Sequence, residues 1–233
     1  MFVALMLVAA LLVPSLGQPN GCPDVFVVGV RGSGQSGYGE QVSGTVEVLV
    51  ERIASSGRSV TDVPLEYPAI SVSDSFGLVL INGDYDRSVA RGVRELRRVL
   101  SVETARCGAS SIVLVGYSQG AQVIKEAVAE SVPDVRIVAL VLLADPTRDP
   151  SQPGVTRIGA RSTARGGSFG ALALPQRLRP VTVDVCALGD VVCERGRLVF
   201  GVHVNGYRDL VGVAARRAVG IVLGTVFGAS GIR

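Results

Sequence analysis

A serine between two glycines is the feature of this sequence that points most directly to chemistry. It lies in residues 116–120 (GYSQG), after the apolar run 112–115 and before a stretch with apolar residues at helical spacing. Between a strand and a helix, two small residues allow a turn so tight that the serine hydroxyl projects above the sheet edge, beside a helix amino terminus. We therefore expect Ser118 to be a nucleophile on such an elbow.

The same pattern occurs again at residues 166–170 (GGSFG), and a chain with 29 glycines is expected to contain chance matches. Residues 162–165 before this second match do not resemble a strand, and Pro175 cuts short the apolar residues after it. The segment after Ser118, in contrast, keeps one apolar face and stops at Pro133. We expect Ser168 to be a loop residue without a chemical role.

A nucleophilic serine needs a general base, and imidazole is the side chain whose ordinary pKa suits that task near neutral pH. The sequence contains one histidine, His203. Its one lysine, Lys125, lies about two helical turns from the serine, which is too far to reach back. His203, in an expected loop, is therefore the candidate base.

A triad also needs a carboxylate that fixes the imidazole tautomer, in a loop after a strand between the serine and the histidine. The contenders are Asp145, Asp184 and Asp190. Asp184 is expected inside a strand, and the proline and long loop after Asp145 are typical of a structural turn. Asp190 lies between two cysteines, thirteen residues before His203, in a loop that a disulfide would hold in place. Asp190 is the candidate acid, with Asp145 as the alternative.

Alternating strands and helices must position these residues. Apolar runs and apolar spacing predict strands at 24–30, 60–65, 112–115, 135–144 and 181–187, and helices at 38–54, 86–106, after the elbow, and at 207–226. This order is typical of an α/β fold with a doubly wound, mainly parallel central sheet and helices on both faces. Residues 146–180 are expected to form a long loop. The active site should lie at the carboxyl ends of the strands, where Ser33, Ser118, Asp145 and Asp190 are all expected.

The 233 residues suffice for one large domain. Residues 1–13 form an apolar run too short to cross a membrane, and small residues follow it, as in secretory signal peptides. We expect a signal peptide over residues 1–17, unless it remains as an anchor, and a single domain over 18–233 that is secreted or held in the cell envelope. A formal charge of +3 gives no indication of nucleic-acid binding.

Four cysteines in an exported chain favour two disulfides over a metal site, because the close cysteine pairs of zinc sites are missing. Of three possible pairings we favour Cys22 with Cys107 and Cys186 with Cys193. On the chain-entropy model the first would contribute about 4.5 kcal/mol and the second about 2.5 kcal/mol. The short bridge should therefore matter more for geometry than for stability.

Residues 31–33 (RGS), 116–120 (GYSQG), 186–193 (CALGDVVC) and His203 together resemble the cutinase family of secreted serine esterases, particularly its bacterial cutinase-like branch. The resemblance spans essentially the whole mature chain. It implies Ser118, Asp190 and His203 as the triad, and Ser33 with the backbone amide of Gln119 as the oxyanion hole. It also implies both disulfides as paired above and an open active site without a large lid.

The expected function is that of a secreted carboxylic ester hydrolase that forms an acyl-enzyme and needs neither metal nor cofactor. The resemblance places the apolar segments 78–81 and 198–200 at the lips of the groove, which suggests an ester with an aliphatic acyl chain, as in a lipid or a polyester. We expect a monomer with transient contact to lipid surfaces. The alternatives are an acetyl (xylan) esterase, a lipid acyltransferase or phospholipase, and a cell-surface binding protein with a vestigial site.

Overall fold

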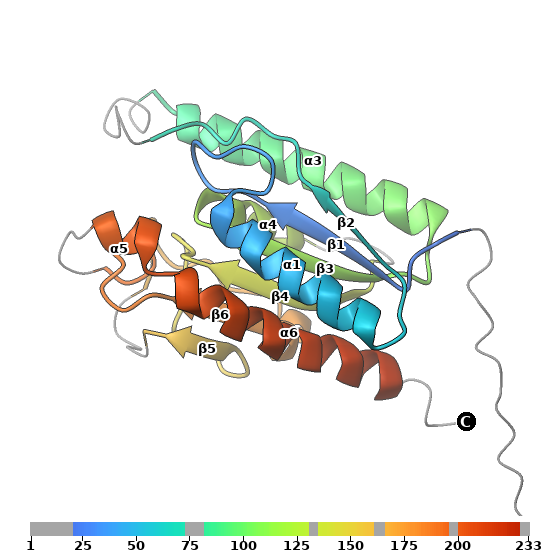
Figure 1. Cartoon of the computed structure of the whole chain (residues 1–233). Coiled ribbons are helices and arrows are strands. Elements are labelled where there is room, and N and C mark those ends of the chain that lie inside the picture. The colour runs from blue at the N-terminus through green and yellow to red at the C-terminus, as the bar shows by residue number, and fades with distance from the viewer. Residues whose placement is uncertain (1–20, 73–81, 131–134, 161–165, 196–199, 229–233) are drawn as a thin grey trace, which may run out of the picture.

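The computed structural model describes residues 21–72, 82–130, 135–160, 166–195 and 200–228. Its centre is one six-stranded sheet in which every neighbouring pair of strands is parallel (Figure 1). The predicted α/β class with a parallel central sheet is confirmed. The strands lie in the order β2-β1-β3-β4-β6-β5, with the bounds Val60–Pro64, Val25–Val30, Ser111–Tyr117, Ile137–Leu143, Thr182–Cys186 and Thr156–Gly159.

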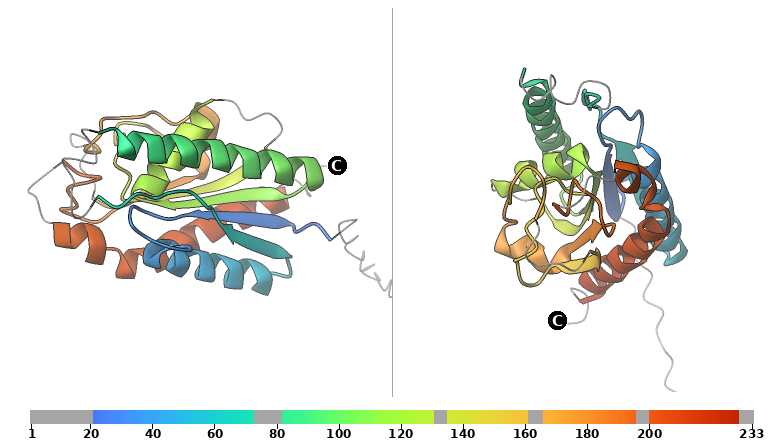
Figure 2. Two further views of the ribbon diagram at one scale, coloured as in Figure 1. Left: turned by 90° about the horizontal axis from the view of Figure 1, so that it is seen from above. Right: turned by 90° about the vertical axis from the view of Figure 1, so that its left-hand side faces the viewer.

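Helices cover both faces of this sheet, as the views in Figure 2 show. Helices α1 (Glu40–Ser55) and α6 (Arg208–Gly228) lie side by side on one face. Helices α3 (Asp84–Arg106) and α4 (Gln119–Ala129) lie on the other. None of the described helices combines the length and apolarity that crossing a membrane requires.

Each face of the sheet has its own apolar core, because successive side chains of a strand point to opposite sides. In β1, Val25 and Val27 pack toward α1 and α6, whereas Phe26 and Val28 pack toward α3 and α4. Helix α3 contributes the apolar stripe that its spacing predicts, formed by Val89, Val93, Leu96 and Leu100.

The strand order fixes where a site can form. The chain runs from β1 outward to β2 and returns to β3, so the connections after β1 and β3 lead to opposite faces of the sheet. A crevice forms at the carboxyl ends of two such strands. The loop that carries Ser33 follows β1, and Ser118 follows β3, so both lie at this switch point.

Two elements differ from the sequence-based expectation. Residues 146–180 are not loop throughout, because β5 forms within them and pairs with β6 at the sheet edge, and a 3-10 helix covers Gln176–Val181. His203 is not in a loop either, because it lies in the short helix α5 (Phe200–Asn205).

Both disulfides join the predicted partners. Cys22, just before β1, is bonded to Cys107 at the end of α3, and Cys186, at the end of β6, is bonded to Cys193. The second bridge closes the loop of residues 186–193, which we name the acid loop because it carries Asp190.

Candidate active site

Ser118 lies on a sharp turn between β3 and α4. Its φ of 53° and ψ of −118° are rarely adopted by a residue with a side chain. The flanking glycines allow this turn, because a Cβ on Gly116 would lie 2.7 Å from the Gly120 carbonyl oxygen, and a Cβ on Gly120 would collide with the Val30 carbonyl oxygen. The structure therefore has the strand, turn and helix of a nucleophile elbow at this serine.

The three candidate triad residues form a continuous chain of polar contacts. Nε2 of His203 lies 3.1 Å from Oγ of Ser118. Nδ1 of the same ring lies 3.0 Å from Oδ2 and 3.1 Å from Oδ1 of Asp190. The Asp190 side chain is completely buried, whereas that of His203 is 15% exposed. The imidazole therefore contacts the hydroxyl on one side and a buried carboxylate on the other.

The Asp190 carboxylate accepts two further hydrogen bonds, one from the acid loop and one from Tyr207, beyond that loop. Oδ1 of Asp190 accepts the Val192 backbone N–H at 2.9 Å, and Oδ2 accepts the Tyr207 hydroxyl at 2.5 Å. The Asp190 backbone N–H donates to the Ala187 carbonyl at 3.0 Å, which tightens the turn. These donors satisfy a buried carboxylate that would otherwise be costly to keep out of water.

Tyr117, the residue before the serine, holds the histidine by its backbone and by its ring. Its hydroxyl donates to the His203 carbonyl at 2.6 Å, and the two rings stack with centroids 5.2 Å apart. Sequence patterns alone assign no function to Tyr117 or to Tyr207. The only sequence signals were their places, one residue before the serine and four residues after the histidine.

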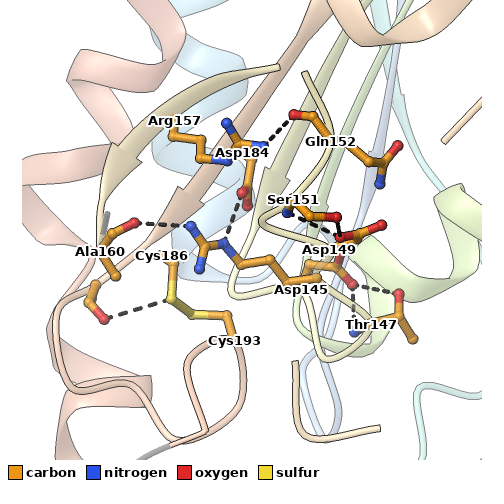
Figure 3. Close-up of polar contacts among 12 residues, drawn as sticks. Asp145, Thr147, Asp149, Ser151, Gln152, Arg157, Ala160, Asp184, Cys186 and Cys193 are labelled. Carbon is orange, nitrogen blue, oxygen red and sulfur yellow. Dashed lines mark hydrogen bonds and ion pairs between the residues drawn. A yellow bond between two sulfur atoms is a disulfide. The ribbon is translucent and has the colours of Figure 1, made fainter. Parts of the chain in front are cut away.

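The two other candidate acids, Asp145 and Asp184, form ion pairs with buried cationic side chains and do not contact the histidine. Lys125 donates to Asp145 at 2.8 Å, with both side chains 2% exposed. Asp145 also accepts the N–H and hydroxyl of Thr147 (Figure 3). Asp184, inside β6 as expected, accepts Nε of Arg148 at 2.8 Å. Burial raises the pKa of Asp184, and Arg148 opposes that rise. Asp190 is thus the aspartate that the fold brings to His203.

This buried network fixes the start of the segment after β4, and Figure 3 shows its contacts at Ala160 and Asp184. The guanidinium of Arg148 donates to the Ala160 carbonyl at 2.9 Å, at the end of β5, as well as to Asp184. The ammonium of Lys125 donates to the Thr147 carbonyl at 2.6 Å. The start of the segment after β4 is therefore fixed to both α4 and β6.

The loop after β1 lies against the elbow. Arg31 donates to the backbone carbonyls of Leu65 and Tyr67, and the Gly34 N–H donates to Ala69 at 2.7 Å. Ser33, in this loop, is partly buried. The side chain of Gln119 turns away into the core, where it accepts the Ser88 hydroxyl at 2.9 Å. Ser33 and the Gln119 backbone thus belong to adjoining turns at one sheet edge.

The second serine between glycines has a different setting. Residues 166–170 lie in a loop, and residues 171–175 after them form neither strand nor helix. The Ser168 backbone N–H donates to the Val192 carbonyl at 2.8 Å, and the Arg195 backbone and side chain donate to the carbonyls of Gly166 and Gly167. This segment packs against the acid loop through its backbone. The apolar lips expected at 78–81 and at 198–199 lie outside the described residues.

Comparisons with known proteins agree with one another. The sequence model of the cutinase family, described as "Cutinase", matches residues 21–219. "Phospholipase Culp4" of Mycobacterium tuberculosis is 31% identical over 88% of this chain and 83% of its own.

Solved structures of cutinase-like enzymes share the fold of this chain. The catalytic core domain of acetyl xylan esterase from Trichoderma reesei superposes with a TM-score of 0.67 at 22% identity, covering 87% of this chain and 98% of that one. A Trichoderma reesei cutinase in complex with a phosphonate inhibitor superposes with a TM-score of 0.57 at 22% identity, over 86% and 77% of the two chains. With the match of the family model over most of its length, the chain belongs to the cutinase family and is a serine esterase.

Proposed function

We propose that Ser118, His203 and Asp190 are the catalytic triad of this esterase and that it hydrolyses carboxylic esters with aliphatic acyl chains. The observation that supports this best is the unbroken contact chain from the serine hydroxyl through both ring nitrogens to a buried carboxylate. It starts on a residue whose strained backbone conformation is typical of nucleophile elbows.

In the proposed mechanism Oγ of Ser118 attacks the ester carbonyl carbon while Nε2 of His203 takes the hydroxyl proton. The negative charge moves to the carbonyl oxygen, where the Ser33 hydroxyl and the Gln119 backbone N–H would donate hydrogen bonds. The tetrahedral intermediate then releases the alcohol, which leaves with the proton from Nε2.

The acyl-enzyme is cleaved by the same groups in reverse order. His203 takes a proton from water, the hydroxide attacks the acyl carbon, and the serine leaves with that proton. Asp190 keeps its charge throughout and stabilises the imidazolium in both halves of the reaction.

An aliphatic substrate is supported by apolar side chains exposed beside the candidate triad. Leu188, in the acid loop, is 78% exposed, and Val204, next to the histidine, is 55% exposed. Phe169, also exposed, packs edge-on against Tyr85, whose hydroxyl donates to Gln122 of helix α4. Exposed apolar groups around a site suit an acyl chain or transient contact with a lipid surface. The 31% identical relative is named a phospholipase, which also fits a lipid ester.

We also propose that the protein is secreted as a monomer, with residues 1–17 as the signal peptide and 18–233 as one domain. Two disulfides suit an oxidising compartment. Amino-terminal sequencing of the exported protein and its mass in solution test these points.

The decisive experiment uses a covalent probe. An alkyl phosphonate ester should label the wild-type protein once, at Ser118, and should not label Ser118→Ala. A panel of esters graded from acetyl to palmitoyl then identifies the substrate class: a maximum at acetyl would favour a deacetylase, and transfer to an added alcohol would favour an acyltransferase. If the folded protein is neither labelled nor active, the alternative of a binding protein with a vestigial site would be favoured.

A further inference from the structure

Tyr207 lies in the turn between α5 and α6, and its side chain is completely buried beside the acid loop. Its hydroxyl donates to Oδ2 of Asp190 at 2.5 Å and accepts the Ala187 backbone N–H at 3.2 Å. The same oxygen lies 3.3 Å from Sγ of Cys193. One phenol oxygen therefore contacts both ends of the disulfide-closed loop and the carboxylate that this loop carries.

We propose that Tyr207 is a positioning residue for ester hydrolysis, which holds the Asp190 carboxylate in the orientation that keeps the His203 imidazole in its active tautomer. This inference rests on the proposed function, because it requires Asp190 and His203 to act in the triad. The disulfide closes the loop through its two ends, whereas the phenol contacts the carboxylate itself.

The role requires the phenol to be a donor, and its surroundings make it one. Burial raises the pKa of Tyr207 well above its ordinary value, and the charge of Asp190 raises it further. The hydroxyl therefore keeps its proton over the pH range in which an imidazole acts as a base. Because the Ala187 N–H occupies its acceptor side, the single proton is directed at Asp190.

The base and the phenol reach the carboxylate from one short segment. His203 and Tyr207 both lie within hydrogen-bonding distance of Oδ2. Gly206 between them allows the close approach, since a Cβ there would lie 2.7 Å from the Val202 carbonyl oxygen and 3.0 Å from Cβ of Ala187. The spacing of histidine, glycine and tyrosine thus places two side chains on one carboxylate.

Other polar groups near this carboxylate are engaged elsewhere. The Tyr117 hydroxyl donates to the His203 backbone, and the Glu194 carboxylate accepts the Gly189 N–H at 3.2 Å. Among the described residues, His203 and Tyr207 are the only ones whose side chains form hydrogen bonds with the Asp190 carboxylate. Removal of the phenol hydroxyl should therefore change the orientation of the carboxylate and, through it, the properties of the His203 imidazole.

The test is Tyr207→Phe, which keeps the ring and removes the hydroxyl. We expect kcat to fall about 10- to 100-fold with KM nearly unchanged, the range that corresponds to one hydrogen bond to a charged group. The acidic limb of log(kcat/KM) should move to higher pH, because a carboxylate with one donor fewer attracts the imidazolium more strongly. A role in folding alone would lower the melting temperature without moving this limb.

Tyr38→Phe is the matched control. It removes another phenol–carboxylate hydrogen bond, the 2.6 Å contact of Tyr38 with Asp62 of β2. Its kinetic constants and pH profile should equal those of the wild type. Equal loss in both variants would overturn the assignment, as would an unchanged kcat and pH profile in Tyr207→Phe.

A spectroscopic readout does not depend on turnover. Because the chain has one histidine, the low-field proton resonance of the bond between Nδ1 and Asp190 comes from a single site. It should shift or exchange faster in Tyr207→Phe and stay in place in Tyr38→Phe. If Tyr207→Phe does not fold, Gly206→Ala is the second variant: its Cβ would lie 3.0 Å from Cβ of Ala187, so we expect it to push the turn that carries the phenol away from the acid loop, lower kcat and move the same resonance. An unchanged kcat and resonance there would overturn the inference. Failure of the phosphonate to label wild-type Ser118 would instead refute the proposed function.

Discussion

Replacement of Asp190 by asparagine tests the candidate triad most sharply, because the geometry dictates how the amide must sit. Val192 presents a backbone N–H to Oδ1 that cannot rotate, so the amide oxygen is expected at that position. The Tyr207 hydroxyl opposite Oδ2 no longer faces a charged acceptor, so it can turn its proton toward Sγ of Cys193, 3.3 Å away, and accept through its second lone pair; the NH₂ group is therefore expected there. The NH₂ group then faces Nδ1 of His203 at about the present 3.0 Å.

This arrangement favours the wrong tautomer of the base. Nδ1 then lies about 3.0 Å from the NH₂ group and about 3.1 Å from the amide oxygen; when it accepts from the NH₂ group, the ring proton moves to Nε2 and points at the hydroxyl of Ser118. The imidazole can then no longer take the serine proton. In serine proteases with the same kind of triad, the corresponding change lowers kcat about 10⁴-fold, or about 5 kcal/mol of activation free energy. We expect a loss of that order with KM little changed.

Asp145→Asn is the paired control, with the opposite pattern expected. It leaves the His203 contacts intact but leaves the buried Lys125 side chain without its carboxylate partner. Breaking a buried pair in this way costs about 3–5 kcal/mol of stability, which corresponds to a fall in melting temperature of roughly 10 °C for a domain of this size. Activity per folded molecule should change far less than in Asp190→Asn.

The assay is ester turnover at a temperature where circular dichroism shows both variants folded, with thermal unfolding measured beside it. If Asp145→Asn loses the activity while Asp190→Asn retains it, the acid is Asp145 and the contact chain through Asp190 has been misread. If Asp190→Asn loses only stability, the carboxylate serves folding alone.

The nucleophile, the short disulfide and the buried phenols can each be tested separately. Ser118→Ala should lower kcat on the order of 10⁶-fold with the fold intact, while Ser168→Ala should match the wild type; the prediction is wrong if both variants stay active or if the second loses activity. The double variant Cys186→Ser, Cys193→Ser should lose activity while its circular dichroism is native, since so short a loop contributes only about 2.5 kcal/mol, and full activity would show that the bridge does not position the acid. Burial raises the pKa of all five tyrosines above the ordinary value of 10.0, so folded phenols keep protons that the unfolded chain releases. This contribution to the free energy of unfolding should be fully present below about pH 10 and should decrease above it. For the four tyrosines other than the partly exposed Tyr38, the decrease is up to about 5 kcal/mol per pH unit. Phenolate absorbance that appears well before unfolding would contradict this.

Much of the architecture is predictable because it depends on local patterns. The stripe of Val89, Val93, Leu96 and Leu100 and the apolar run before Ser118 specify a helix and a strand whatever surrounds them. Strand β5 is not predictable in this way, since it has four residues, lies at the sheet edge and is only partly buried. Helix α5 spans six residues and includes a glycine and two β-branched valines, so its helical state depends on tertiary contacts.

In the candidate site, too, some residues are predictable from local patterns and others depend on tertiary contacts. The serine and its elbow follow from glycine spacing, and the candidate base follows from the presence of one histidine. Which of Asp190 and Asp145 contacts His203 depends on the tertiary fold: Asp190 does so, whereas Asp145 pairs with Lys125 across twenty residues of sequence. The contact of Tyr207 with the acid loop is likewise a matter of tertiary approach, which no local pattern encodes.

The burial of Lys125 has a practical consequence. It is the only lysine of the sequence, and in the folded protein its ammonium group is enclosed between Asp145 and Thr147. Reagents that acylate lysine side chains therefore cannot reach this group until helix α4 and the segment after β4 separate. The rate at which Lys125 becomes modified would report the opening of this region at a single, chemically unique position, without an engineered probe. The same property makes surface arginines and carboxylates, rather than amines, the groups through which the folded enzyme could be immobilised or cross-linked by its side chains.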